Sequence, residues 1–213
     1  MADKSHKKEV RRVRRDEDKA KRARQARTQN IMVWGGLGLI VLVTGFIVIQ
    51  AINPANQPGE FVRDQGNRHV SSPDEVAPGT YNSVPPTSGP HMGSLWNWGI
   101  SREQIPDAWQ VHNLEDAGVI LQYDCPDGCP ELETQLHEFA TRIMGDTSLA
   151  NPATGGIHFI LAPYSGIRAA SGGKPIALTA WTRIQYFDTV DADAMMKFIR
   201  AYINIDHHVR GTG

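Results

Sequence analysis

Five side chains in the middle of the sequence combine imidazole and carboxylate groups, which are donors that bind zinc, copper and iron in proteins. In chain order they are His69, His91, His112, Glu115 and Asp116. Gathering them in one place would need either a metal ion or a closed hydrogen-bond network to offset their desolvation. We therefore predict a metal site here, with copper or zinc as the candidate cofactor. The alternative is that the histidines only hydrogen-bond to backbone groups.

The only two cysteines, Cys125 and Cys129, stand in the segment DCPDGCP between an expected strand and an expected helix. Outside the cytoplasm the simplest expectation is a disulfide. A redox-active pair is an alternative, because a thiol at a helix N-terminus has a lowered pKa and strand–dithiol–helix is the layout of thioredoxin-like proteins. The C-x-x-x-C spacing and the acidic neighbours argue against it. A thiolate metal site is the third alternative.

Three further polar residues are assigned no chemistry. Glu133 and His137 are spaced i, i+4 on the expected helix and should face water. His158 lies in an apolar strand and should be a hydrogen-bonded core residue. The sequence contains no nucleophile elbow, phosphate loop, zinc-protease motif or dinucleotide fingerprint. We predict no catalytic residue, and a protein without enzymatic activity is favoured over an enzyme.

Two motifs carry a resemblance to a known family. YNSVPPTSGPH (81–91) and VHNLEDAGV (111–119) together resemble the bacterial domain-of-unknown-function family 3105, whose members pair PPTSGPH with VHNLEHGGV. The resemblance extends from about His69 to Ile203. It implies a membrane-anchored or secreted extracytoplasmic domain and brings no established activity. Asp116 and Ala117 depart from the family pattern, which has histidine and glycine there.

The elements that must position these residues follow from hydrophobic periodicity. Strands are expected at 119–123, 157–162 and 176–184, with helices at Pro130–Met144 and 190–203. The order β-α-β-β-α implies a right-handed parallel crossover followed by an antiparallel hairpin. The predicted fold class is therefore α+β with a mixed sheet, a core that thioredoxin-like domains also contain.

The rest of the predicted domain, 67–205, has little periodicity. Its first part, 67–116, is rich in proline and glycine and contains Trp96, Trp98 and Trp109. Large aromatic side chains allow an irregular segment to pack in an ordered way. We predict that this segment covers the sheet. Residues 206–213 are expected to form a flexible tail.

The residues before this domain have the pattern of a membrane anchor. Ile31–Ile49 contains no charged residue, and a helix of that length matches a hydrocarbon core of about 30 Å. We predict a transmembrane helix over 31–52 and a linker over 53–66. Residues 1–30 hold twelve Lys and Arg against five Asp and Glu, whereas the remainder holds ten against eighteen. Positive charge beside a span stays in the cytoplasm, so the N-terminus is expected inside the plasma membrane and the domain outside.

Three function classes remain open at this stage. They are a non-catalytic accessory module with a transition-metal site, a thioredoxin-like thiol-disulfide redox protein, and a structural subunit of a larger membrane complex. The expected partners are the lipid bilayer, anionic lipid headgroups that contact the basic residues of 1–30, and other membrane-complex subunits. Nucleic acid is not an expected partner, because the basic run directly precedes the predicted span.

Overall fold

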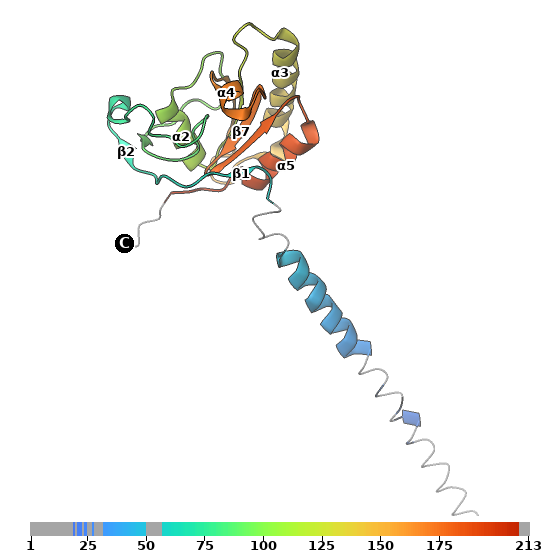
Figure 1. Ribbon diagram of the computed structural model, residues 1–213. Coiled ribbons are helices and arrows are strands. Elements are labelled where there is room, and N and C mark those ends of the chain that lie inside the picture. Colours follow the sequence, from blue (N-terminus) through green and yellow to red (C-terminus); the bar gives the residue numbers. More distant parts are fainter. Residues whose placement is uncertain are drawn as a thin grey trace, which may run out of the picture. The chain divides into compact units, whose positions relative to one another are not determined.

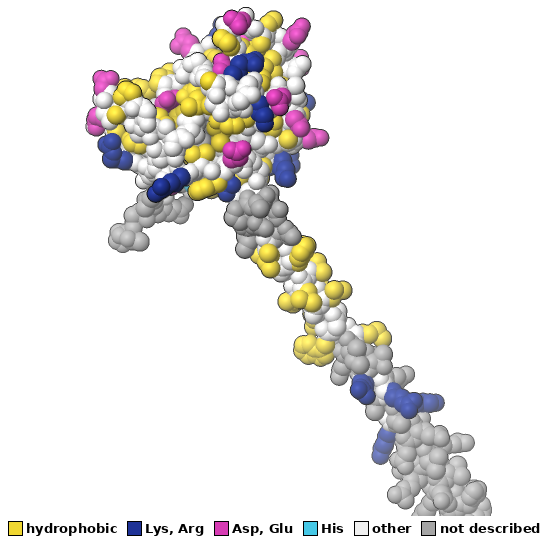
Figure 2. Space-filling view, viewed as in Figure 1, with side chains coloured by type: hydrophobic (Ala, Val, Ile, Leu, Met, Phe, Trp, Pro, Cys, Tyr) yellow, Lys and Arg dark blue, Asp and Glu magenta, His cyan; other side chains and the backbone are white. Residues whose placement is uncertain are grey.

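The computed structural model describes residues 19, 21–22, 24, 27, 32–49 and 57–208 (Figure 1). It divides into two compact units, Met1–Gln57 and Pro58–Gly213. In the first unit, the helix Met32–Ile49 has a mean hydropathy of 2.4 and no buried residue. Hydrophobic side chains cover this helix in Figure 2. It is long and apolar enough to cross a membrane. Most of the basic tail and residues 50–56 lie outside the described residues.

The second unit is built on a mixed six-stranded sheet with the order β1-β8-β7-β5-β6-β4. β5 pairs in parallel with β6, and β6 with β4, while β7 is antiparallel to both β5 and β8. β1 pairs antiparallel with β8 at the opposite edge. The expected α+β class with a mixed sheet is confirmed. The strands are β1 (Glu60–Phe61), β4 (Gly99–Ile100), β5 (Val119–Tyr123), β6 (Phe159–Pro163), β7 (Ile176–Ala180) and β8 (Arg183–Phe187).

Layers of helix and irregular chain cover both faces of this sheet. Val119 and Leu121 of β5 face a buried cluster that includes α3 (Pro130–Gly145) and α5 (Ala192–Tyr202). Ile120, between them, faces the opposite cluster, which includes α2 (Asp107–Glu115). Figure 1 shows α3 and α5 on one side of the sheet and α2 on the other. This alternation follows from the two-residue period of a strand.

The two long helices follow from local sequence signals. α3 begins with Pro130, which lacks the N–H that a first helical position leaves unpaired, and it buries Leu136, Phe139 and Ile143. α5 begins after Asp191, whose side chain accepts a hydrogen bond from the Ala194 amide. The expectation for α3 is confirmed to within one residue.

The expected third strand, 176–184, is two strands. β7 and β8 are separated by Trp181 and Thr182, and Thr182 has a positive φ of 57°. The hairpin is therefore β7–β8, and the expectation that 157–162 would pair with 176–184 was wrong. Strand propensity explains the error, because β7 is buried at every position and the separating residues Trp181 and Thr182 are of types that strands favour.

The nine-residue helix α2 was not expected. Seven of its residues are buried, so no polar stripe alternates with an apolar one. Several of these buried residues are polar, among them Gln110, His112, Asn113 and Glu115. A helix buried on nearly every side and carrying polar groups inward has no amphipathic signature in its sequence.

The irregular segment covers the sheet as expected. Tyr81, Trp96, Trp98 and Trp109 pack against the cluster that contains α2. Asn113 fixes the segment to α2, since its side chain accepts from the Trp96 amide and donates to the Trp96 carbonyl, both at 2.9 Å. The short elements of this region are β2 (His69–Val70), β3 (His91–Met92) and the 3-10 helix η2 (Pro73–Glu75); η3 (Thr147–Leu149) and α4 (Ile167–Ser171) follow later in the chain.

The domain begins earlier than the sequence indicates. Within the segment expected to be a linker, β1 completes one edge of the sheet. The Pro58 carbonyl also accepts a hydrogen bond of 2.6 Å from the Tyr202 hydroxyl of α5. Residues from about 58 onward are therefore part of the folded domain.

Candidate metal centre

Three segments far apart in the sequence bring the predicted donors together. β2 and β3 pair in parallel with His69 directly opposite His91. His112 and Glu115 lie in the last turn of α2, and Asp116 is its C-cap residue. The His91 and His112 ring centroids are 5.3 Å apart, and those of His69 and His112 are 5.2 Å apart. The structure thus places all five predicted residues in one cluster.

Glu115 is the centre of this cluster. Its side chain is 1% exposed, and its Oε2 atom lies 2.8 Å from His91 Nε2 and 3.2 Å from His69 Nε2. The same oxygen lies 3.5 Å from His112 Nδ1 and 3.4 Å from Nε2 of a fourth histidine, His208. Four imidazole nitrogens therefore lie within 3.5 Å of a single carboxylate oxygen.

His91 is oriented by the backbone. Its Nδ1 atom donates a 2.7 Å hydrogen bond to the Gly89 carbonyl, so its Nε2 atom is directed at Glu115. The carbonyl thereby fixes the orientation of the ring. Gly89 has a φ of 123°, a conformation that favours glycine, so the glycine of the PPTSGPH motif serves to orient His91.

His112 has a buried nitrogen without a hydrogen bond. Its Nδ1 atom has no hydrogen-bond partner among the described residues, although Glu115 Oε2 lies 3.5 Å away. Its Nε2 atom lies 3.4 Å from Asp116 Oδ2. Burial lowers the pKa of His112, which favours the neutral ring with a free lone pair. A buried, unprotonated nitrogen directed at other donors is what a metal ligand requires.

His208 was not predicted as a site residue. The segment 206–208, expected to belong to a flexible tail, returns to α2, where the His207 amide donates to the Glu115 carbonyl at 2.9 Å. His208 Nδ1 lies 2.8 Å from Asp206 Oδ1 and 3.3 Å from Asp116 Oδ1. The only sign of this site residue in the amino-acid sequence was the tripeptide Asp-His-His after the last helix. The expected tail residues 209–213 lie outside the described residues.

His207 and Trp181 attach this C-terminal segment to the sheet. Their rings stack with centroids 5.9 Å apart and an interplanar angle of 21°. Burial lowers the pKa of His207, so its ring tends to be neutral on the indole. The Asn204 amide donates to the Ala117 carbonyl at 2.9 Å, which adds a second attachment beside the cluster.

The charges in the cluster favour ionised acids. Burial alone would raise the pKa of Glu115, but hydrogen bonds with His69 and His91 lower it below its ordinary value. Burial likewise works against a charged His208, yet Asp206, Glu115 and Asp116 together raise its pKa. The cluster therefore holds a buried carboxylate that stays negative and is available to a cation.

The remaining candidate residues lie elsewhere. Cys125 and Cys129 form a disulfide at the far end of β5. His158 is buried, donates to the Asp116 carbonyl at 2.8 Å and stacks on Trp98, as expected for a core histidine. The disulfide lies outside the histidine cluster, and His158 contacts it only through the Asp116 backbone carbonyl.

Four of the donors have the spacing of one coordination shell. The ligand atoms of His69, His112, Glu115 and His208 all lie within 4.8 Å of one another. Atoms bound about 2.0–2.1 Å from a tetrahedral zinc ion lie about 3.3 Å apart, close to the 3.2, 3.5 and 3.4 Å from Glu115 to these three histidines. His91 is not one of these four, and its Nε2 atom lies 2.8 Å from Glu115 Oε2.

The fold and this cluster define a class of protein: an α+β domain with a histidine–carboxylate cluster at the amino end of its central strand. A family model described as a protein of unknown function (DUF3105) matches residues 69–211, and the chain belongs to that family. Neither the curated proteins nor the solved structures include a match to the chain.

Proposed function

We propose that this protein binds one divalent transition-metal ion, zinc or copper, through His69, His112, Glu115 and His208. The observation that carries the proposal is the four imidazole nitrogens within 3.5 Å of Glu115 Oε2. One carboxylate oxygen offers about two lone-pair sites, so hydrogen bonds cannot satisfy four nitrogens. A cation shared by three imidazoles and the carboxylate satisfies them together, with His91 left to orient Glu115.

The donor types narrow the choice of metal. Imidazole suits zinc and copper, and a carboxylate is a harder donor that favours divalent ions over Cu(I). Zn²⁺ and Cu²⁺ are therefore the ions to test first. Of the five ligands expected from the sequence, the proposal keeps His69, His112 and Glu115, adds His208, and leaves His91 and Asp116 outside the ligand set.

The number of protein donors supports a non-catalytic role. A catalytic zinc site keeps one position open for water, whereas four protein ligands close a tetrahedral shell. The His69 and His208 side chains are 48% and 36% exposed, so one side of the site is open to solvent while Glu115 is buried. This arrangement fits an accessory module that holds an exchangeable ion near its surface.

The apolar helix supports a location for the module. We place it on the outer face of the cytoplasmic membrane, anchored by Met32–Ile49 with the basic residues of 1–30 inside, near anionic headgroups. A reporter enzyme that is active only outside the cytoplasm, fused after Gly213, should be active. Activity of a cytoplasm-specific reporter at the same position would reverse the orientation.

A metal titration tests the proposed function. The full-length protein in detergent would be stripped with a chelator, incubated separately with Zn²⁺ and Cu²⁺, and separated from free metal by gel filtration. Elemental analysis should find one equivalent of at least one of these metals bound. His112→Ala should lose it, whereas His137→Ala, which removes a histidine of α3 outside the cluster, should retain it. No bound metal in the unaltered protein, or full retention in His112→Ala, would overturn the proposal.

A further inference from the structure

A second group of reactive side chains lies at the other end of β5. Glu115 precedes this strand, and the Cys125–Cys129 disulfide follows it. A five-residue strand is about 17 Å long, so the two sites are too far apart to share a ligand. Cys129 is the N-cap residue of the 16-residue helix α3, and both cysteines are only partly buried.

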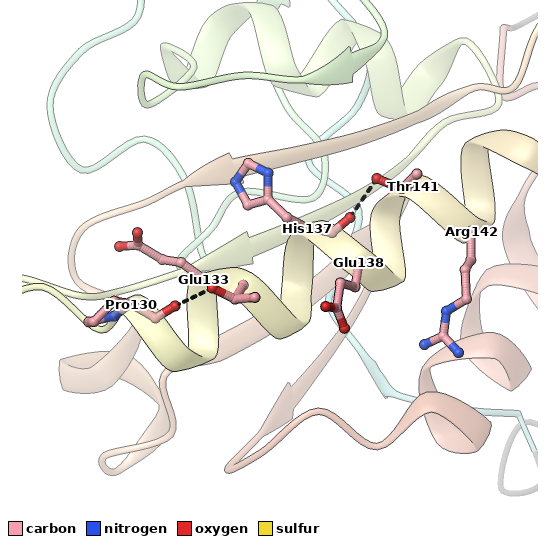
Figure 3. A pocket seen from close by; sticks show the side chains of 7 residues that line it. Pro130, Glu133, His137, Glu138, Thr141 and Arg142 are labelled. Carbon is pink, nitrogen blue, oxygen red and sulfur yellow. Dashed lines mark hydrogen bonds between the residues drawn. The ribbon is translucent and has the colours of Figure 1, made fainter.

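A pocket of about 400 Å³ adjoins the disulfide. It is lined by Arg102, Tyr123, Cys125, Glu133, His137 and Pro163. Figure 3 draws another pocket along α3 that shares two of these residues; Glu133 and His137 project from the same side of the helix there, whereas Glu138 and Arg142 project from the other side in that view. Cys125 lines this pocket and Cys129 does not, so Cys125 is the cysteine closer to a group that enters it.

A purely structural role leaves these features unexplained. A disulfide stabilises by restricting the unfolded chain, and a loop closed over a separation of four residues restricts it little. One acidic neighbour of the disulfide, Asp124, is engaged in hydrogen bonds with another segment. The Asp124 carboxylate accepts hydrogen bonds of 3.0 Å from the amides of both Gly166 and Arg168, at the start of α4. The negative charge of Asp124 therefore disfavours a cysteine thiolate less than its position next to Cys125 in the sequence indicates.

We propose that Cys125 and Cys129 form a thiol-disulfide exchange site for a peptide or protein that carries two thiols. A thiolate of the partner attacks Cys125 Sγ, a sulfur–sulfur bond forms between partner and Cys125, and the Cys125–Cys129 bond breaks. Its electron pair stays on Cys129 as a thiolate. The second thiolate of the partner then attacks the partner sulfur of this mixed disulfide and releases Cys125.

Atoms and electrons balance over these two exchange steps without a further reagent. The partner loses two electrons and becomes a disulfide, and the two protons of its thiols pass to Cys125 and Cys129. The leaving group is at the N-terminus of α3, where the helix dipole and the free amides of the first turn stabilise negative charge. Glu131 and Glu133 in that turn oppose this effect, and Arg102 brings a positive charge to the same pocket.

The test compares the disulfide in the protein with the same disulfide outside the fold. Full-length protein in detergent and the oxidised heptapeptide of residues 124–130 would each be mixed with a reduced synthetic peptide containing two cysteines. Acid quenching, alkylation and mass spectrometry would follow the exchange. The protein should react at least about tenfold faster than the heptapeptide, because pKa and access control such rates. The trapped mixed disulfide should be on Cys125.

Matched variants test the pocket. Arg102→Ala should slow exchange several-fold, whereas Arg142→Ala removes a cation of α3 outside the pocket and should leave the rate unchanged. A protein that reacts no faster than the heptapeptide would overturn the proposal, as would a mixed disulfide found on Cys129. The exchange assay involves no metal, so its result is independent of the metal titration.

Discussion

Nε2 of His91 lies 2.8 Å from Oε2 of Glu115, while Nδ1 of the same ring donates to the Gly89 carbonyl. The carbonyl fixes which ring nitrogen points inward, and the inward nitrogen fixes the rotamer of the carboxylate. Glu115 Oε2 is thereby held at the point where His69, His112 and His208 also converge. The contact between His91 and Glu115 therefore positions the carboxylate ligand, so that the three other histidines can bind the same metal ion.

The C-terminal segment should contribute to metal affinity. Because His208 Nε2 belongs to the group of four donors, His208→Ala should weaken binding of Zn²⁺ at least about tenfold, the lower limit for disturbing even outer-shell partners. His137→Ala is the matched control, since it removes a histidine of α3 that lies outside the cluster. Isothermal titration of the full-length protein measures both. Equal affinities for the two variants would exclude His208 as a ligand.

Gly118 should be sensitive to a single added methyl group. A Cβ atom there would meet the Asn113 carbonyl oxygen and would lie 2.7 Å from the Trp98 ring. Gly118→Ala should therefore lower the free energy of unfolding by about 1–3 kcal/mol, as overpacking does. A Cβ atom added at Gly145 would have nothing within 4 Å, so Gly145→Ala should change the free energy of unfolding by no more than about 0.5 kcal/mol. Urea unfolding measures the stability of both variants. Equal stabilities would show that Gly118 does not pack closely against Asn113 and Trp98.

Asp107 should make stability depend on pH. Its Oδ1 accepts from the Tyr164 hydroxyl and the Gln110 side chain, both at 2.9 Å, yet burial raises its pKa above the ordinary 3.8. The folded state then binds more protons than the unfolded state, so this residue lowers stability as pH rises from about 3.8 through the folded pKa. Asp107→Asn can accept the same hydrogen bonds without a charge.

The measurement for Asp107 is a comparison of unfolding free energies for the variant and the unaltered protein between pH 4 and pH 7. The stability of Asp107→Asn relative to the unaltered protein should increase over this range. Other carboxylates contribute equally to both proteins and cancel in the difference. A difference that stays constant or decreases with pH would show that burial does not raise the pKa of Asp107.

The sequence predicted the parts of the fold that have one-sided burial. α3 and α5 each bury a single stripe, and β5 stands out as a short apolar run with turn residues after it. α2 could not be predicted in this way, because it is buried on nearly every side and carries polar groups inward. β7 and β8 merged into one predicted strand because Trp181 and Thr182, which separate them, are residue types that strands favour.

The site could be predicted only in part. His112 stands three and four residues before Glu115 and Asp116, and donor chemistry alone indicated that these residues and His91 could meet. His208 could not be found by spacing, because its proximity to Glu115 depends on how α5 returns the chain to α2. The central role of Glu115 over Asp116 depends on which side chain α2 buries, and that too is a property of the fold.

The most direct test of the account is X-ray absorption spectroscopy of the full-length protein loaded with Zn²⁺. The proposed site should give a first shell of four nitrogen or oxygen atoms at about 2.0–2.1 Å, with outer-shell scattering from three imidazole rings. His208→Ala should lose one imidazole contribution, because His208 Nε2 is one of the four donors. Sulfur scattering at about 2.3 Å would assign the ion to the cysteines instead. A shell without imidazole scattering would contradict the histidine–carboxylate site altogether.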